Sequence, residues 1–118
     1  MTSPEEWQVH YYRTADGRVP YREWRDALRD RQAAAAIEAR LGRLKLGLLG
    51  DCRPVGEGVL ELRVHVGPGY RVYFLRAGAK VVVLLCGGDK RSQASDIRTA
   101  KRYRRDYDHQ THGSLGSG

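Results

Sequence analysis

The sequence predicts an α+β domain with the element order β-α-α-β-β-β-α. A helical hairpin and a C-terminal helix are expected to pack on one face of a mostly antiparallel sheet. The length of 118 residues suits one domain with one modest core. Apolar residues recur every second position in some segments and at helical spacing in others, which separates strands from helices. Hydrophobic residues make up 41% of the chain, enough for a folded core.

The N-terminal half predicts one strand and two helices. Residues 7–13 alternate apolar and polar side chains, as a half-buried strand does. Pro20 suits the first position of a short helix that carries apolar residues at helical spacing to Leu28. Asp30 is placed to cap a second helix, whose apolar stripe is Ile37, Leu41, Leu44 and Leu48. Residues 51–58 are then predicted to be a linker.

The C-terminal half predicts three strands and a helix. Residues 59–66 and 70–75 alternate on either side of a Gly-Pro-Gly turn, and residues 80–86 form a near-continuous apolar run typical of a central strand. The last helix starts at Ser92 or Ser95, with the apolar stripe Ile97, Ala100, Tyr103 and Tyr107. Residues 109–118 are polar and rich in glycine and serine, so we expect a domain at 1–108 and a disordered tail at 109–118.

The charge and the cysteines indicate the class of protein. Lysine and arginine number 21 against 14 acidic residues, a net charge of +7 that attracts polyanions such as nucleic acid. An arginine-rich surface can also reflect only a GC-rich genome. Residues 1–6 lack the apolar core of a signal peptide, and no run is long enough to span a membrane. Cys52 and Cys86 share no metal-ligand spacing, so we expect a cytoplasmic protein with reduced thiols, no metal and no cofactor.

Strand pairing gathers cations on the face that the helices leave open. If the Gly-Pro-Gly turn is the hairpin loop, His65 lies opposite Arg71, and Arg63 lies opposite Tyr73. Alternation then places these four side chains on one face, with Lys90 near its rim. Like charges at this spacing repel each other, so their presence together favours an anionic ligand.

This group has the chemistry that RNA cleavage by its own 2′-hydroxyl requires. Arg63, Arg71 and Lys90 would bind the charged phosphorane, and His65 would donate or accept a proton. Tyr73 would stack a base or orient the phosphate. The alternative is an ordinary solvated sheet face with surface arginines, a strand histidine and a packing tyrosine.

Two stretches resemble a toxin family. Residues 61–74 (Glu-Leu-Arg-Val-His-Val-Gly-Pro-Gly-Tyr-Arg-Val-Tyr-Phe) and 87–93 (Gly-Gly-Asp-Lys-Arg-Ser-Gln) resemble the HigB-like "addiction module killer protein" branch of the RelE/ParE superfamily. The resemblance extends from Val9 to Tyr107. It implies a RelE-like fold and the toxin of a type II toxin–antitoxin system. It also implies a helix-turn-helix antitoxin partner and translation inhibition by ribosome-dependent mRNA cleavage, commonly at the A site.

The resemblance also suggests residue roles. Arg71 matches the phosphate-binding arginine of RelE-like toxins, and Arg63 falls where those toxins place a catalytic lysine. Lys90 or Arg91 matches the basic position after the last central strand. The catalytic set is therefore expected to be Arg63, His65, Arg71 and Lys90, with Tyr73, Arg91 and Gln93 binding the substrate.

One departure leaves the general base unassigned. The best-studied branch places a tyrosine shortly after the basic position, and Ile97 occupies that place here. His65 is the substitute that this sequence offers. ParE-like relatives share the fold but inhibit DNA gyrase without cutting RNA, which is the alternative function. A non-catalytic RNA- or ribosome-binding domain is the third.

Overall fold

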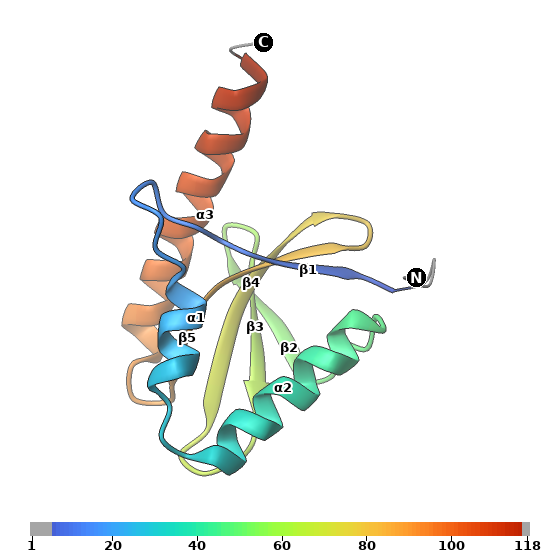
Figure 1. Ribbon diagram of the computed structural model, residues 1–118, viewed down its shortest axis with the longest axis vertical. Helices are drawn as coiled ribbons and strands as arrows, with labels where there is room; N and C mark the ends of the chain where they lie inside the picture. Colours follow the sequence, from blue (N-terminus) through green and yellow to red (C-terminus); the bar gives the residue numbers. More distant parts are fainter. Residues whose placement is uncertain (1–5, 117–118) are drawn as a thin grey trace.

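The computed structural model describes residues 6–116, with side chains as far as Thr111 (Figure 1). It confirms the α+β class, the mostly antiparallel sheet and the three helices, and it adds one strand. The elements are β1 (Gln8–Tyr11), α1 (Pro20–Ala27), α2 (Arg31–Lys45), β2 (Cys52–Gly56), β3 (Val59–Val64), β4 (Tyr70–Gly78), β5 (Val81–Asp89) and α3 (Gln93–Gly116).

The five strands form one sheet in the order β1-β5-β4-β3-β2. Strands β2 to β5 pair antiparallel, whereas β1 lies parallel to β5. The linker predicted for residues 51–58 is wrong, because β2 lies within it. Pro54 and the irregular register between Pro54 and Gly56 hide the strand from pattern analysis. At the edge of a sheet, a proline need not donate a hydrogen bond to a neighbour, so the strand tolerates it.

Helices α1 and α2 cover one face of the sheet. Asp30 caps α2 as predicted, because its Oδ1 accepts the backbone N–H groups of Gln32 and Ala33 at 3.0 and 3.1 Å. The buried helical residues of this core are Tyr21, Ile37, Leu41 and Leu44, and the sheet contributes Leu62, Val64, Val72, Phe74, Val82 and Leu84. The predicted stripe of α2 is thus largely confirmed, although Leu48 lies beyond the helix and is exposed.

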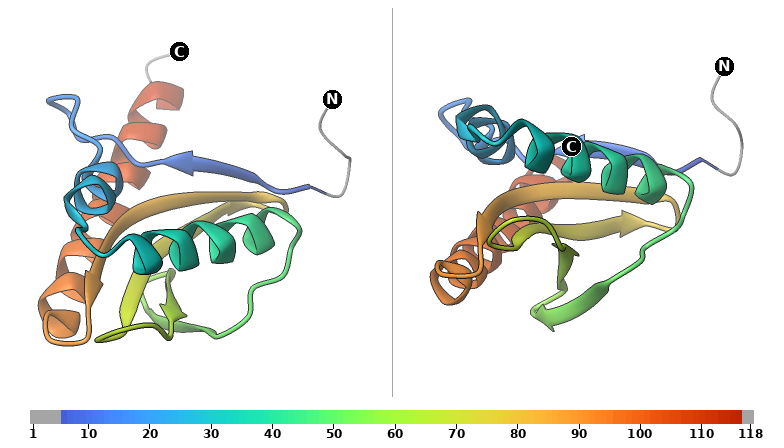
Figure 2. Two further views of the ribbon diagram at one scale, coloured as in Figure 1. Left: turned by 60° about the horizontal axis from the view of Figure 1, so that its bottom comes forward. Right: turned by 90° about the horizontal axis from the view of Figure 1, so that it is seen from below.

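Helix α3 covers the opposite face, so the prediction that all helices pack on one face is wrong (Figure 2). Its Ala100 lies in a second core with Tyr12, Val59, Tyr73, Leu75, Val83, Leu85 and Cys86. Residues 72–75 of β4 and 82–86 of β5 are buried at every position, and such strands need cover on both sides. The fold is therefore a helix–sheet–helix arrangement of three layers.

Two glycines at the end of β5 let both helical layers approach the strand. A Cβ atom on Gly87 would lie 2.3 Å from the Trp24 ring of α1. A Cβ on Gly88 would lie 1.8 Å from Oδ2 of Asp96 in α3. A residue larger than glycine at either position would have to displace the Trp24 ring or the Asp96 side chain. The glycine pair therefore fixes where β5 leaves the sheet and where Lys90 begins the next loop.

Helix α3 continues to Gly116, into the segment 109–118 that we expected to be disordered, and residues 117–118 lie outside the described residues. Residues 1–5, on which the signal-peptide prediction depended, also lie outside them. Within the described part of the chain, no helix is long and apolar enough to cross a membrane. Cys52 and Cys86 are free.

Candidate functional site

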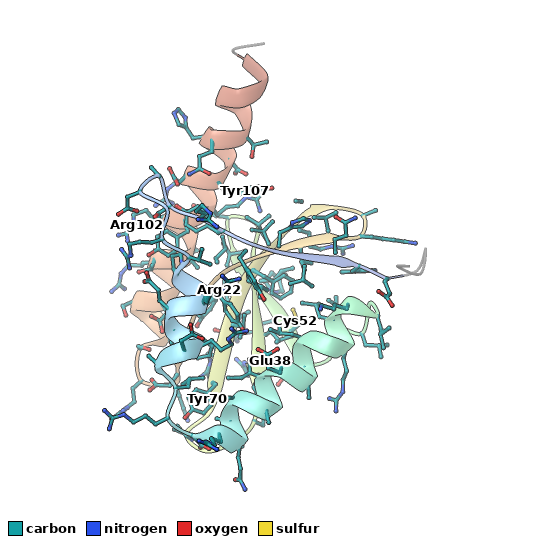
Figure 3. All side chains as sticks on the ribbon, viewed as in Figure 1. Arg22, Glu38, Cys52, Tyr70, Arg102 and Tyr107 are labelled. Atoms are coloured by element: carbon teal, nitrogen blue, oxygen red, sulfur yellow. The ribbon has the colours of Figure 1, made fainter. Side chains whose placement is uncertain are left out.

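A cavity of about 490 Å³ opens where the loop between β3 and β4 meets the end of β5. Tyr70, labelled in Figure 3, marks the start of β4 at this end of the sheet. The cavity is lined by Arg63, His65, loop residues 66–69, Arg71 and Lys90. All four titratable side chains of this lining are basic. This group, the cationic cavity, attracts anions, and arginine forks suit the oxygens of a phosphate.

The structure thus brings together Arg63, His65, Arg71 and Lys90, but with a different strand register from the one predicted. Arg63 pairs directly with Arg71, whereas the prediction placed His65 there. Residues 65–69 form the loop, closed by the Val66 N–H to the Val64 carbonyl at 3.1 Å and by the Gly69 N–H to the Val66 carbonyl at 3.0 Å. The error is two residues, which preserves the face of every side chain, whereas a slip of one would have reversed it.

Glycines shape the loop and tie it to the neighbouring strand end. Gly67 and Gly69 have φ angles of 55° and 84°, in the left-handed region that glycine adopts at little cost. The Gly69 carbonyl accepts the backbone N–H of Lys90 at 3.2 Å. This bond holds the start of the β5–α3 loop against the β3–β4 loop, so the Lys90 side chain reaches the same cavity as the two arginines.

A buried carboxylate explains how two arginines can lie side by side. Glu61 is completely buried, two positions before Arg63 on β3. Its Oε1 accepts hydrogen bonds from Nε of Arg53 at 3.1 Å and Nε of Arg63 at 3.2 Å. Its Oε2 lies 3.6 Å from Nε of Arg71. The negative charge of Glu61 offsets part of the repulsion between the arginines.

The pKa of Glu61 reflects the same contacts. Burial raises it, because a buried carboxylate loses its hydration, but hydrogen bonds from neighbouring donors more than compensate. The pKa lies below the ordinary glutamate value as a result, so Glu61 is ionised at neutral pH. The donors are Gln93, Arg63, Tyr73 and Arg53. An ionised Glu61 is required for its role as counter-ion of the arginines.

The two cavity arginines keep their terminal nitrogens available. The ion pairs with Glu61 are made through the Nε atom of each side chain, and no Nη atom of Arg63 or Arg71 makes a hydrogen bond within the described residues. The Arg71 side chain is only 11% exposed, so it is held in place while lining the cavity. Its Nε has no hydrogen-bond partner. Such pre-positioned forks can bind phosphate oxygens with little reorganisation.

His65 has a carboxylate partner of its own. Its Nε2 contacts Oδ2 of Asp51, the residue immediately before β2, while the imidazole remains 70% exposed. The hydrogen bond from His65 is the main reason that the pKa of Asp51 is lowered. The arrangement resembles the acid–base pairs of enzymes, in which a carboxylate orients a histidine. Asp51 is not among the predicted site residues, because a linker at residues 51–58 gives no reason for its side chain to approach His65.

Tyr73 is not placed as predicted for base stacking. Its ring is fully buried under α3, and its hydroxyl donates to Oε2 of Glu61 at 3.0 Å. Burial is the main reason that its pKa is raised. Gln93, in the first turn of α3, also donates to Oε2 of Glu61, at 2.9 Å. Both residues therefore support Glu61 from inside the protein.

Arg91 lies apart from the cationic cavity. Its side chain is 91% exposed and forms an ion pair with Asp89 at 3.8 Å. The Asp89 carboxylate also accepts the backbone N–H groups of Arg91 and Ser92, which fixes the loop into α3. Ile97 packs against the second core, beneath α3. Among the residues that the structure describes, no group of three or more His, Cys, Asp or Glu side chains is arranged to hold a metal ion.

Comparison with known proteins identifies the family. Residues 22–108 match the model of the family described as "Phage derived protein Gp49-like (DUF891)". An uncharacterized protein of Haemophilus influenzae is 44% identical over 83 residues, which cover 70% of this chain and 84% of the relative. The family match contains every residue that lines the cationic cavity, together with Asp51, Arg53 and Glu61 beside it. This chain belongs to the Gp49-like family of phage-derived proteins.

Proposed function

We propose that this protein is the toxin of a type II toxin–antitoxin system, of the HigB-like branch of the RelE superfamily. Its activity is cleavage of mRNA on the ribosome, without a metal ion, which stops translation. The observation that carries the proposal is the cationic cavity, in which Glu61 pre-positions Arg63 and Arg71 and their Nη atoms remain available. Membership of the Gp49-like family and the resemblance of the cavity motifs to HigB-like toxins support it.

The reaction divides among the residues of the cavity. The 2′-oxygen attacks the adjacent phosphorus and the bond to the 5′-oxygen breaks, which leaves a 2′,3′-cyclic phosphate and a free 5′-hydroxyl. Arg63 and Arg71 bind the non-bridging oxygens as charge builds up on them, and Lys90 adds a third positive charge. His65, oriented by Asp51, exchanges one of the two protons of the reaction, either from the 2′-hydroxyl or to the 5′-oxygen.

The partners follow from the charge and the proposed activity. The toxin acts in the cytoplasm, where mRNA and ribosomes are found. A helix-turn-helix antitoxin neutralises it, and a protein of net charge +7 provides a surface for an acidic or amphipathic segment of that partner. Co-expression with the adjacent gene should restore growth and yield a stable complex. If neither occurs, the pairing is wrong.

The test is to induce the protein alone in bacterial cells and to measure the rates of protein synthesis and of DNA synthesis over time. Protein synthesis should stop before DNA synthesis, and mapping of mRNA 5′ ends should show new cuts within translated regions. An earlier stop of DNA synthesis, with a DNA-damage response, would indicate gyrase inhibition instead. Arrest of translation with intact mRNA would indicate a non-catalytic ribosome binder. Either of these results would overturn the proposed activity.

A further inference from the structure

A second cavity adjoins the cationic cavity, and His65 lines both. It measures about 270 Å³, and its other lining residues come from α2 and the end of β3. These residues are Ala36, Ala39, Arg40, Arg43 and Val64. We call it the α2 cavity. A ligand that extends beyond the cationic cavity in this direction must pass His65, the residue to which we assign proton transfer.

The α2 cavity combines small apolar side chains with guanidinium groups. Ala36, Ala39 and Val64 offer methyl groups. Arg40 is held by two neutral acceptors, since its Nη1 donates to the Arg63 carbonyl at 3.0 Å and its Nη2 to the Leu49 carbonyl at 2.9 Å. Arg40 forms no ion pair within residues 6–116, although the carboxylate of Asp51 interacts with its charge at longer range. The two hydrogen bonds fix the plane of the guanidinium.

Arg43 adds a second positive charge to the α2 cavity. Its side chain is exposed and makes no hydrogen bond or ion pair within the described residues. Arg25 of α1 provides a contrast, because Glu38 of α2 binds it at 3.0 Å. The arginines of the α2 cavity are therefore available to an external anion or to an aromatic ring.

We infer that the α2 cavity binds a nucleobase next to the phosphate held in the cationic cavity. The inference rests on the proposed function, because it takes the ligand to be single-stranded RNA. Planar bases stack on guanidinium groups and apolar side chains, and base edges accept hydrogen bonds from arginine. The volume lies just under the roughly 300 Å³ at which small-molecule pockets begin, which suits one ring system. With the phosphate and the base in adjacent cavities, the ribose between them lies at His65.

The test fills the α2 cavity without touching the cationic one. Ala39→Leu adds bulk in the α2 cavity, and Ala35→Leu adds the same bulk one turn earlier on the exposed surface of α2, outside the lining. Arg43→Ala removes a cation without adding bulk. Thermal unfolding of all three variants checks that each is folded. Cleavage rates are measured in a translating extract, with a set of mRNAs that carry each of the four bases on either side of the mapped cut.

The wild-type protein should discriminate among bases at one of the two flanking positions by roughly tenfold, the scale of discrimination that arginine hydrogen bonds to a base edge provide. Ala39→Leu and Arg43→Ala should reduce this discrimination to within about twofold and slow the favoured mRNA, whereas Ala35→Leu should behave like the wild type. Unchanged discrimination in both cavity variants, or an equal loss in Ala35→Leu, would overturn the nucleobase site and leave the proposed function intact. If both variants cut normally but escape neutralisation by the antitoxin, the cavity binds the antitoxin instead. If the wild-type protein cuts no mRNA, both proposals are wrong.

Discussion

The Nε atom of Arg71 lies 3.6 Å from Oε2 of Glu61, a carboxylate with no exposed surface, and has no hydrogen-bond acceptor. The pair is held by charge attraction rather than by a hydrogen bond. The hydroxyl of Tyr73 and the side-chain amide of Gln93 donate hydrogen bonds to the same Oε2 atom, at 3.0 and 2.9 Å. Glu61 therefore links α3 to the two strands that carry the cavity arginines, and it acts on a ligand through those arginines.

Glu61→Gln should destabilise the fold and impair the cavity together. The amide keeps the shape of the side chain but removes the charge that Arg63 and Arg71 face. Loss of one partner from a buried charge cluster costs about 3 kcal/mol in the free energy of unfolding, which chemical denaturation measures. Wild-type stability would contradict the central role of Glu61. Inorganic phosphate that binds in the cationic cavity should raise the unfolding free energy of the wild-type protein, and this gain should be smaller in the folded variant. A variant that had only lost stability would keep the full gain.

Arg71→Ala should lower mRNA cleavage by about 10²-fold, the scale of one lost transition-state donor. Arg71→Lys should recover only part of this loss, since it keeps the charge but not the fork. Arg76→Ala, at the other end of the same strand, is the matched control, because Arg76 contacts Ala79 and the Trp7 ring, away from the cavity. Cleavage rates at equal protein concentration distinguish the variants. Equal effects of Arg71→Ala and Arg76→Ala would contradict a specific role for the cavity.

The part of the site that follows from alternation could be predicted from the sequence. Strand parity alone puts Arg63 and Arg71 on one face, and it survives an error of two residues in the register. Alternation says nothing about which face a distant helix covers. Tyr73 is therefore predicted to lie on an open face, whereas α3 buries it.

Glu61 and Asp51 show why the partners of the cations escaped prediction. The period of two places Glu61 on the same face as Arg63, but a lone glutamate in a strand is usually solvated, and its burial depends on α3. Asp51 approaches His65 only because β2 pairs with β3, and Pro54 conceals that strand. A carboxylate among cations on one strand face was the signal available for Glu61.

Gly87→Ala should destabilise the protein, whereas Gly42→Ala should not. A Cβ at position 87 would lie 2.3 Å from the rigid Trp24 ring, so α1 must shift or the strand must bend, at a cost of about 1–3 kcal/mol. Gly42 lies in α2 with no atom within 4 Å of its added Cβ, and alanine favours a helix by about 1 kcal/mol over glycine. Thermal unfolding measures both. A neutral Gly87→Ala would show that the Trp24 contact is not tight.

Stability should fall in acid in a manner that depends on Glu61. Its folded-state pKa is lowered, so the unfolded chain takes up a proton first as the pH falls through the ordinary glutamate value of about 4.3. The stabilisation is complete above that value and is lost as the pH falls toward the folded-state pKa. Glu61→Gln should flatten the slope of unfolding free energy against pH in this window. Burial raises the pKa of Asp96, which acts in the opposite direction, but it is common to both proteins. Parallel slopes would contradict the prediction.

His65 and Asp51 should behave as one unit in catalysis. His65→Ala should reduce cleavage by about 10²-fold or more, as for the loss of a general acid or base. Asp51→Asn keeps the histidine but weakens its orientation, so we expect a smaller loss of roughly tenfold. Both side chains are solvent-exposed, and neither change should alter unfolding by more than about 0.5 kcal/mol.

The double variant separates positioning from a structural effect. If Asp51 acts through His65, adding Asp51→Asn to His65→Ala should cause no further loss, because the residue that it orients is already gone. His10→Ala is the matched control, since His10 is an exposed histidine on β1 that contacts Gln8. It should cut mRNA like the wild type. The measurement is the cleavage rate, across pH 5 to 9, of the wild type, Asp51→Asn, His65→Ala and the double variant. Independent, multiplicative losses for Asp51→Asn and His65→Ala would show that Asp51 acts on the reaction without His65.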